Sequence, residues 1–127
     1  MTATVLIVDD SKLARIVLGK AVAALQPAWQ RVEAAGAEAA MAVIAARAID
    51  VAIIDYNMPG RDGLALAEEL RERFPAMPIA VATANIQDEI IARARAANAT
   101  FVPKPVTEDG LRGFISGAAL RLRAPPA

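Results

Sequence analysis

Short apolar runs alternate with longer stretches of helical period along the whole chain, and this alternation constrains the fold more than any other feature. Residues 5–8 and 51–54 are apolar at successive positions, so both faces of each run are expected to be buried. Burial of both faces is typical of strands in a parallel sheet. With three further candidates, the expected strands are residues 5–8, 29–34, 51–54, 79–82 and 100–102.

Each strand candidate is followed by a segment whose apolar residues recur three or four positions apart. The first helix is predicted from Leu13, Ile16, Val17, Ala21, Ala24 and Leu25, with Pro27 ending it. An alanine-rich helix follows at residues 37–48, and the third helix is marked by Leu66, Leu70 and Phe74. The fourth carries Ile86, Ile90, Ala94 and Ala97, and the last turns Leu111, Phe114, Ile115, Ala118 and Leu122 inward.

Three polar residues are placed to cap the later helices. Asp62 is expected to cap the third helix, Asn85 the fourth and Thr107 the last. Five β-α units in succession predict a doubly wound α/β fold, a parallel sheet with five helices on its two faces. The whole chain, residues 1–127, is expected to form one domain with a core of about 4–122 and a short Pro-rich tail at 124–127.

Composition excludes several kinds of function. The 127 residues include no cysteine and no histidine, which excludes disulfides, thiol catalysis, histidine acid–base chemistry and the usual zinc sites. The 14 basic and 14 acidic residues balance, which argues against a nucleic-acid surface. Neither a signal peptide nor an apolar stretch of about 20 residues is present, so we expect a cytoplasmic protein that does not enter a membrane.

Polar residues follow the expected strands at their carboxyl ends. Asp9 and Asp10 follow the first strand, Asp55 the third, Thr83 the fourth and Lys104 the fifth. In an open parallel sheet these ends share one edge, where ligands bind at the point at which strand order reverses. The sequence therefore predicts a site at this edge.

Three carboxylates in one crevice repel each other and need a counter-ion or must take up protons, since a pair about 4 Å apart costs about 4 kcal/mol at a dielectric constant near 20. A hard divalent cation bound by oxygen, Mg²⁺ (or Mn²⁺), meets this need. A phosphoryl group is the natural ligand of such a centre, with Thr83 donating a hydrogen bond and Lys104 neutralising charge. With Cys and His missing, the nucleophile would be a carboxylate.

Taken singly, each of these residues also has a structural explanation. Asp9 and Asp10 could cap the helix that begins near Ser11, Asp55 could be a turn residue, and Lys104 a solvated charge. Yet the chain has three lysines against eleven arginines, and Lys104 is the only lysine outside the first helix. A compact point charge at this position favours the functional interpretation.

Four motifs resemble those of the response-regulator receiver domains of two-component signalling: Val8-Asp9-Asp10-Ser11, Asp55 to Gly60 with Asp62-Gly63, Thr83-Ala84 and Lys104-Pro105. The resemblance implies a CheY-like sheet with strand order 2-1-3-4-5. It implies that Asp55 accepts a phosphoryl group from a sensor histidine kinase. Magnesium would be bound by Asp10, Asp55 and the backbone carbonyl of Asn57, with Asp9 acting through a water. Thr83, Lys104 and the backbone of Ala84 would contact the phosphoryl group, and the peptide bond before Pro105 would be cis.

By the same resemblance the chain is a switch and not an enzyme acting on other substrates. Phe101 stands where family members carry a switch aromatic, here without a hydroxyl, so packing alone would drive its movement. Phosphorylation would change the output surface, which would then bind a target protein. Ala99 and Thr100 stand where many DNA-binding relatives that dimerise through the last face of the domain carry two acidic residues, so we expect a monomer or weak dimer without direct DNA binding.

Four alternatives stay open. The chain could be a stand-alone regulator or a piece of a hybrid kinase or longer regulator. It could be an aspartate-nucleophile phosphatase. Proteins of that class carry an Asp-x-Asp motif after the first strand, whereas this chain has Asp9-Asp10-Ser11 there. It could be a pseudo-receiver that acts as a passive scaffold. A flavin-binding module shares the fold, but no Ser/Thr/Gly loop that could cradle a phosphate follows the first strand.

Overall fold

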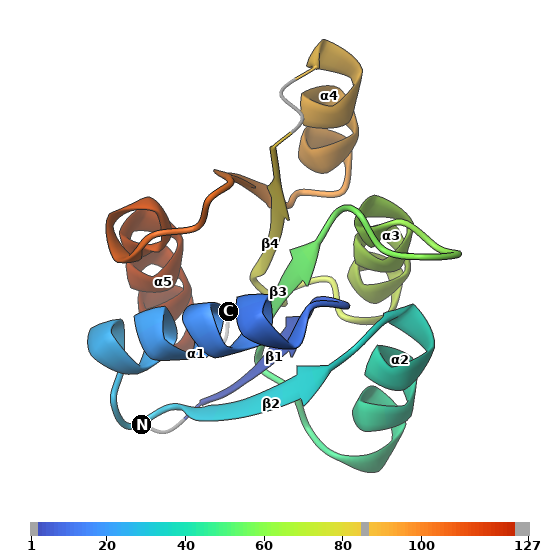
Figure 1. Cartoon of the computed structure of the whole chain (residues 1–127). Helices are drawn as coiled ribbons and strands as arrows, with labels where there is room; N and C mark the ends of the chain where they lie inside the picture. The colour runs from blue at the N-terminus through green and yellow to red at the C-terminus, as the bar shows by residue number, and fades with distance from the viewer. Residues whose placement is uncertain (1–2, 85–86, 124–127) are drawn as a thin grey trace.

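The computed structural model describes residues 3–84 and 87–123 as a parallel sheet covered by helices on both faces (Figure 1). Its strands are β1 (Thr4–Val8), β2 (Gln30–Ala34), β3 (Val51–Asp55), β4 (Ile79–Thr83) and β5 (Thr100–Pro103). They are all parallel and lie in the order β2-β1-β3-β4-β5, which confirms the expected topology. Strand order reverses between β1 and β3, where the carboxyl ends of the strands form a crevice.

The helices are α1 (Lys12–Leu25), α2 (Ala37–Ala46), α3 (Gly63–Arg73), α4 (Asp88–Ala96) and α5 (Glu108–Arg123). Two caps form as expected: Asp62 Oδ1 accepts from Ala65 N at 2.8 Å, and Thr107 Oγ1 accepts from Gly110 N at 3.0 Å. The cap predicted at Asn85 lies outside the described residues, and Gln87 is the N-cap of α4. No described helix offers the unbroken apolar length that a bilayer crossing requires.

Two apolar clusters fill the space on either side of the sheet. One lies under α2, α3 and α4 and contains Leu6, Ile54, Leu66 and Leu70. The other lies under α1 and α5, which run beside each other on the opposite face in Figure 1. Because the central strands β3 and β4 are buried along their whole length, they hold the strand ends at the crevice rigidly.

Helix α1 buries a face that coincides only in part with the predicted apolar pattern, since Ala21 is buried and Leu25 packs against the core. Leu18, Ala21 and Val22 face the sheet. Leu13, Ile16 and Val17, part of the predicted apolar pattern, are instead 71%, 41% and 45% exposed. Leu18, Ala21 and Val22 thus pack α1 on the sheet, and Leu13, Ile16 and Val17 form an exposed apolar surface in the first half of the helix, next to the crevice.

Candidate functional site

The carboxyl ends of the strands bring the predicted polar residues together. Asp9 directly follows β1, Asp55 is the last residue of β3, and Thr83 is the last of β4. These three are the buried polar or charged residues among those described, with exposures of 1%, 2% and 0%. Buried charges are rare unless they are paired or bind a ligand, so these residues mark the crevice as the leading candidate for a functional site.

Asp9, Asp10 and Asp55 converge on one point. Each offers a carboxylate oxygen, and these oxygens lie within 4.8 Å of one another. Asp9 and Asp55 are buried whereas Asp10 is exposed, so the cluster opens to solvent on the Asp10 side. The arrangement can therefore admit a ligand from outside while holding two of its groups in a fixed, desolvated position.

Lys104 supplies a positive charge to this cluster. Its Nζ lies 2.6 Å from Asp55 Oδ1 and 3.7 Å from Asp9 Oδ2. Its backbone is held as well, since Lys104 N donates to Thr83 O at 3.1 Å. The Lys104–Pro105 peptide bond is cis, as expected. The side chain is 30% exposed, so its ammonium group can reach both the buried carboxylates and solvent.

The charges change the protonation of the cluster. Burial raises the pKa of Asp9 above its ordinary value of 3.8, and the nearby Asp55 and Asp10 act in the same direction. The hydrogen bond from Ser11 N and the charge of Lys104 lower it by less. For Lys104, burial opposes the charged form, but contact with Asp55 and the charge of Asp9 outweigh burial and raise its pKa above 10.5.

A divalent cation fits this set of groups. Asp9 Oδ2 and Asp55 Oδ1 are buried and accept no aligned hydrogen bond, and Lys104 is the one cation that the described residues bring within ion-pair distance of them. Two or three carboxylates with an open side match the preference of Mg²⁺ for oxygen ligands and retained waters. The donors present could thus hold Mg²⁺ through Asp10 and Asp55, with Asp9 beside it.

Gly63 lets α3 approach the end of β3. A Cβ atom at this position would clash with the carbonyl oxygen of Asp55 and would lie 2.8 Å from its carbonyl carbon and 2.9 Å from Tyr56 Cα. In its place Gly63 N donates to Tyr56 O at 2.9 Å. The first residue of α3 therefore rests directly on the backbone of Asp55.

The remaining predicted residues lie around the rim. Asn57 is exposed, two residues beyond Asp55, in the loop that leads to α3, and Ala84 is exposed just after Thr83. Phe101 is half-buried on β5, where it pairs with Val81, and lies outside both core clusters. Its position thus differs from that of a fully buried core residue, while its role as a switch stays a prediction.

Two residues next to the site were not anticipated. Arg15 donates to the backbone carbonyl of Asp9 at 2.7 Å and to Glu33 Oε1 at 2.8 Å. One sequence signal could have pointed to Arg15: a cation in the first turn of a helix opposes the helix dipole and calls for a separate explanation.

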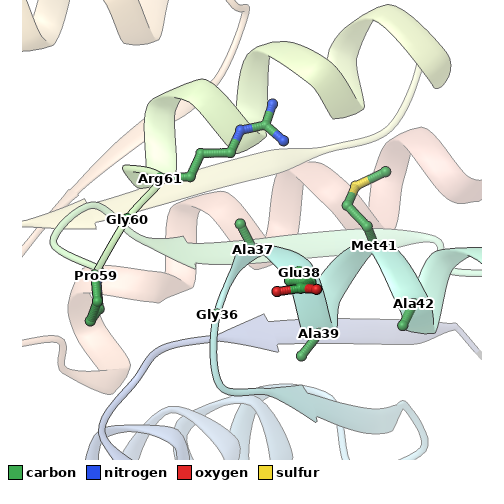
Figure 2. Close-up of a pocket in the computed structure, with 9 residues that line it drawn as sticks. All are labelled: Gly36, Ala37, Glu38, Ala39, Met41, Ala42, Pro59, Gly60 and Arg61. Atoms are coloured by element: carbon green, nitrogen blue, oxygen red, sulfur yellow. The ribbon is translucent and has the colours of Figure 1, made fainter.

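A groove elsewhere on the surface is separate from the crevice. It lies between the start of α2 and the loop before α3, with Ala37 and Met41 on one side and Pro59 and Arg61 on the other (Figure 2). None of the crevice residues lines it. Arg61 at its rim is already paired with Glu69, at 2.6 Å.

Comparisons with known proteins agree with this geometry. A family model, the response regulator receiver domain, matches residues 5–116. The chain is 33% identical to the response regulator protein FleR of Pseudomonas aeruginosa over 94% of its length, and 34% identical to the DNA-binding transcriptional regulator NtrC of Escherichia coli over 81%. It spans only 25% and 22% of the lengths of these two relatives.

Solved structures share the fold over nearly the whole chain. The chemotaxis protein CheY4 of Vibrio cholerae superposes with a TM-score of 0.82 at 26% identity, covering 93% of this chain and 99% of that one. The signal receiver domain of an HD domain-containing protein from Pseudomonas fluorescens gives 0.85 at 20% identity, covering 94% and 96%, and at that identity it supports the fold alone.

Proposed function

The chain belongs to the response regulator receiver domain family of two-component systems, whose members are phosphorylation-dependent switches, and from this premise we propose that Asp55 is its phosphoacceptor. The observation that carries the proposal is the convergence of Asp9, Asp10 and Asp55 within 4.8 Å, beside Lys104. The donor in this proposal is a phosphohistidine of a partner histidine kinase, and the exchange takes place in the cytoplasm.

In the proposed transfer an oxygen of Asp55 forms a bond to phosphorus while the bond between phosphorus and the donor imidazole breaks. The imidazole leaves with a proton from solvent, and an acyl phosphate remains on Asp55. Bound Mg²⁺ would neutralise the charge that gathers on the phosphoryl oxygens. Lys104, now 2.6 Å from Asp55, would move its ion pair to a phosphoryl oxygen.

Thr83 and Phe101 would pass the change on to the surface. Thr83 is fully buried at the end of β4, next to the strand that carries Asp55. A new phosphoryl oxygen would attract its hydroxyl, and Phe101 would then pack into the space behind it. The segment that follows Thr83 leads to α4, so the surface of α4, β5 and α5 is where a target protein would sense the change. In this proposal the chain acts as a switch and not as an enzyme on outside substrates.

The exposed apolar surface of α1 supports a protein as the phosphoryl donor. Leu13, Ile16 and Val17 lie within two turns of Asp10, and α1 carries basic residues and no acidic one. An apolar helix surface with acidic neighbours would complement it. Leu13→Ser should therefore slow transfer from a histidine kinase that labels the native chain, and leave labelling by acetyl phosphate unchanged.

The direct test is the intact mass after incubation with acetyl phosphate, with and without Mg²⁺, for the native chain and for Asp55→Asn. The proposal expects a Mg²⁺-dependent gain of one phosphoryl group that Asp55→Asn lacks. No gain under any condition would leave the chain as a scaffold. Sustained turnover of phosphate esters would instead favour a hydrolase.

A further inference from the structure

Arg15 fixes the backbone of Asp9 from the helix that follows it. Its side chain is 15% exposed, and its guanidinium group joins two elements, with Nη1 2.7 Å from Asp9 O and Nε 2.8 Å from Glu33 Oε1. Glu33 lies on the edge strand β2, where it pairs with Ile7. A planar guanidinium can donate to both partners at once in a fixed geometry, which an ammonium group cannot do.

The other polar groups of Asp9 are fixed in the same way. Asp9 N donates to Ala34 O at 3.1 Å, and Asp9 Oδ1 accepts from Ser11 N at 2.9 Å. With the carbonyl held by Arg15, one oxygen of the residue, Oδ2, is left facing the cluster without an aligned hydrogen bond. Asp9 thus presents a single oxygen at a position set by its neighbours.

The placement of Arg15 is unfavourable for helix α1 itself. A positive charge in the first turn lies at the positive end of the helix dipole, and the first turn of α1 has no acidic residue to offset it. Its contacts run to the backbone of Asp9 and to Glu33 on β2, so they join the start of α1 to the edge strand and to the first residue of the carboxylate cluster.

From these contacts we infer that Arg15, oriented by Glu33, is a positioning residue that sets the affinity of the carboxylate cluster for a divalent cation. This inference rests on the proposed function, because it takes Mg²⁺ as the ion of the site. Residues that orient metal ligands from behind commonly change metal affinity about 10-fold to 100-fold when they are replaced. Arg15 acts on the backbone of a residue at the edge of the site, so the low end of this range applies.

The test is a titration with Mn²⁺, with the free ion measured by EPR, on the native chain and its variants. Arg15→Gln should raise the Kd about 10-fold. Arg15→Lys should have a Kd between those of the native chain and Arg15→Gln, since a lysine can keep one of the two contacts of Arg15. Glu33→Gln should raise the Kd about 3-fold, and adding it to Arg15→Gln should have no further effect, because Glu33 acts through Arg15. Arg47→Gln is the matched control, since Arg47 bonds Gln30 at the far end of the same strand, at 3.0 Å.

Thermal unfolding without metal separates positioning from plain stability. A Kd within 2-fold of the native value in Arg15→Gln, with a lowered Tm, would overturn the inference, since Arg15 would then serve the fold alone. If Arg15→Gln does not fold, an unchanged Kd in Glu33→Gln overturns it equally. A native chain that binds no Mn²⁺ and gains no phosphoryl group would instead refute the proposed function.

Discussion

Carboxylates occur in two opposite settings in this molecule, the crevice and the surface of α3. In the crevice three carboxylates lie together, and one lysine pairs with two of them, both buried. On α3 and its neighbours Asp62, Glu68 and Glu69 face three arginines at 2.6 to 3.6 Å, and all six side chains are at least a quarter exposed. The surface charges are balanced by their neighbours, whereas the crevice retains an excess of negative charge that a bound cation or a proton would neutralise.

The comparison teaches that the number of acidic residues does not identify a site. What distinguishes the crevice is that its buried carboxylates are desolvated and have too few positively charged partners. Their burial costs free energy that a bound cation would offset. Exposed ion pairs are screened by water and each contributes little. Four variants test this contrast, ordered from the largest expected effect to the smallest.

Gly63→Ala should have the largest effect, because it disturbs the backbone that carries the crevice. The new methyl group would meet the backbone of Asp55 and Tyr56, which cannot yield as a side chain can. We expect the free energy of unfolding to fall by about 3 kcal/mol in urea denaturation. Gly117→Ala on α5, where a Cβ meets nothing within 4 Å, is the control and should gain up to about 1 kcal/mol from helix propensity. Equal stabilities of the two variants would contradict the rigid packing described here.

Lys104→Met should have the second-largest effect, because it removes the one positive charge that pairs with the cluster. Asp55 and Asp9 would lose ion pairs of 2.6 and 3.7 Å. Allowing for the partial exposure of Lys104, we expect a loss of about 2 kcal/mol without metal. Mg²⁺ should raise the Tm of this variant more than that of the native chain. Lys20→Met on the exposed side of α1 controls for the loss of a lysine, and a metal response equal to the native one would argue against the cluster as the site.

Asp9→Asn should act in the opposite direction and stabilise the metal-free chain by about 1 kcal/mol near neutral pH, since a buried carboxylate beside Asp55 and Asp10 is replaced by a neutral group. The pKa of Asp9 is raised in the folded state, so this state binds the proton more tightly than the unfolded state. Through this group, stability therefore rises as the pH falls from the raised pKa toward 3.8.

The advantage of Asp9→Asn over the native chain should accordingly shrink as the solution becomes acidic. Thermal unfolding from neutral to acidic pH, without metal, measures this difference. Lys104 is charged over that whole range, so the change would report the carboxylates alone. A destabilised Asp9→Asn at neutral pH would show that the attraction of Lys104 outweighs burial and repulsion.

Glu68→Gln should have the smallest effect, at most about 0.5 kcal/mol, because it removes the charge from one exposed pair, that of Glu68 with Arg93 at 3.1 Å. Salt at about 1 M should abolish the difference from the native chain, since screening acts fully at an exposed pair. Urea denaturation at low and high salt measures it. A loss above about 1.5 kcal/mol would show that an exposed ion pair on α3 contributes as much to stability as the buried charges of the crevice, and would contradict the contrast between the two regions.

The sheet and most of its site could be predicted from the sequence because both follow from covalent order. A residue that directly follows a buried parallel strand, such as Asp9, must lie at the carboxyl edge whatever the loops do. The strand order and the cis bond before Pro105, which the resemblance to receiver domains implied, were confirmed. The chemical roles assigned to Asp55, Thr83 and Phe101 remain predictions that the experiments above test.

The features that could not be predicted depend on contacts between distant segments. Periodicity marked α1 as amphipathic but did not show that Leu18 and Val22 would face the sheet while Leu13 faced solvent, because both sets recur at helical spacing. The contact between Arg15 and Glu33 needs the register of β1 with β2, which pairs Ile7 with Glu33. No local pattern encodes that register.

The edges of the sheet have a consequence for how the protein behaves at high concentration. An edge strand exposes unpaired backbone groups to which another chain can add, and this is a common route to aggregation. The outer strand β2 carries charges at Arg31 and Glu33, and β5 at the other edge is four residues long and ends in Pro103, which has no amide hydrogen to donate. Both edges of the sheet thus carry features that disfavour strand pairing with another copy of the chain.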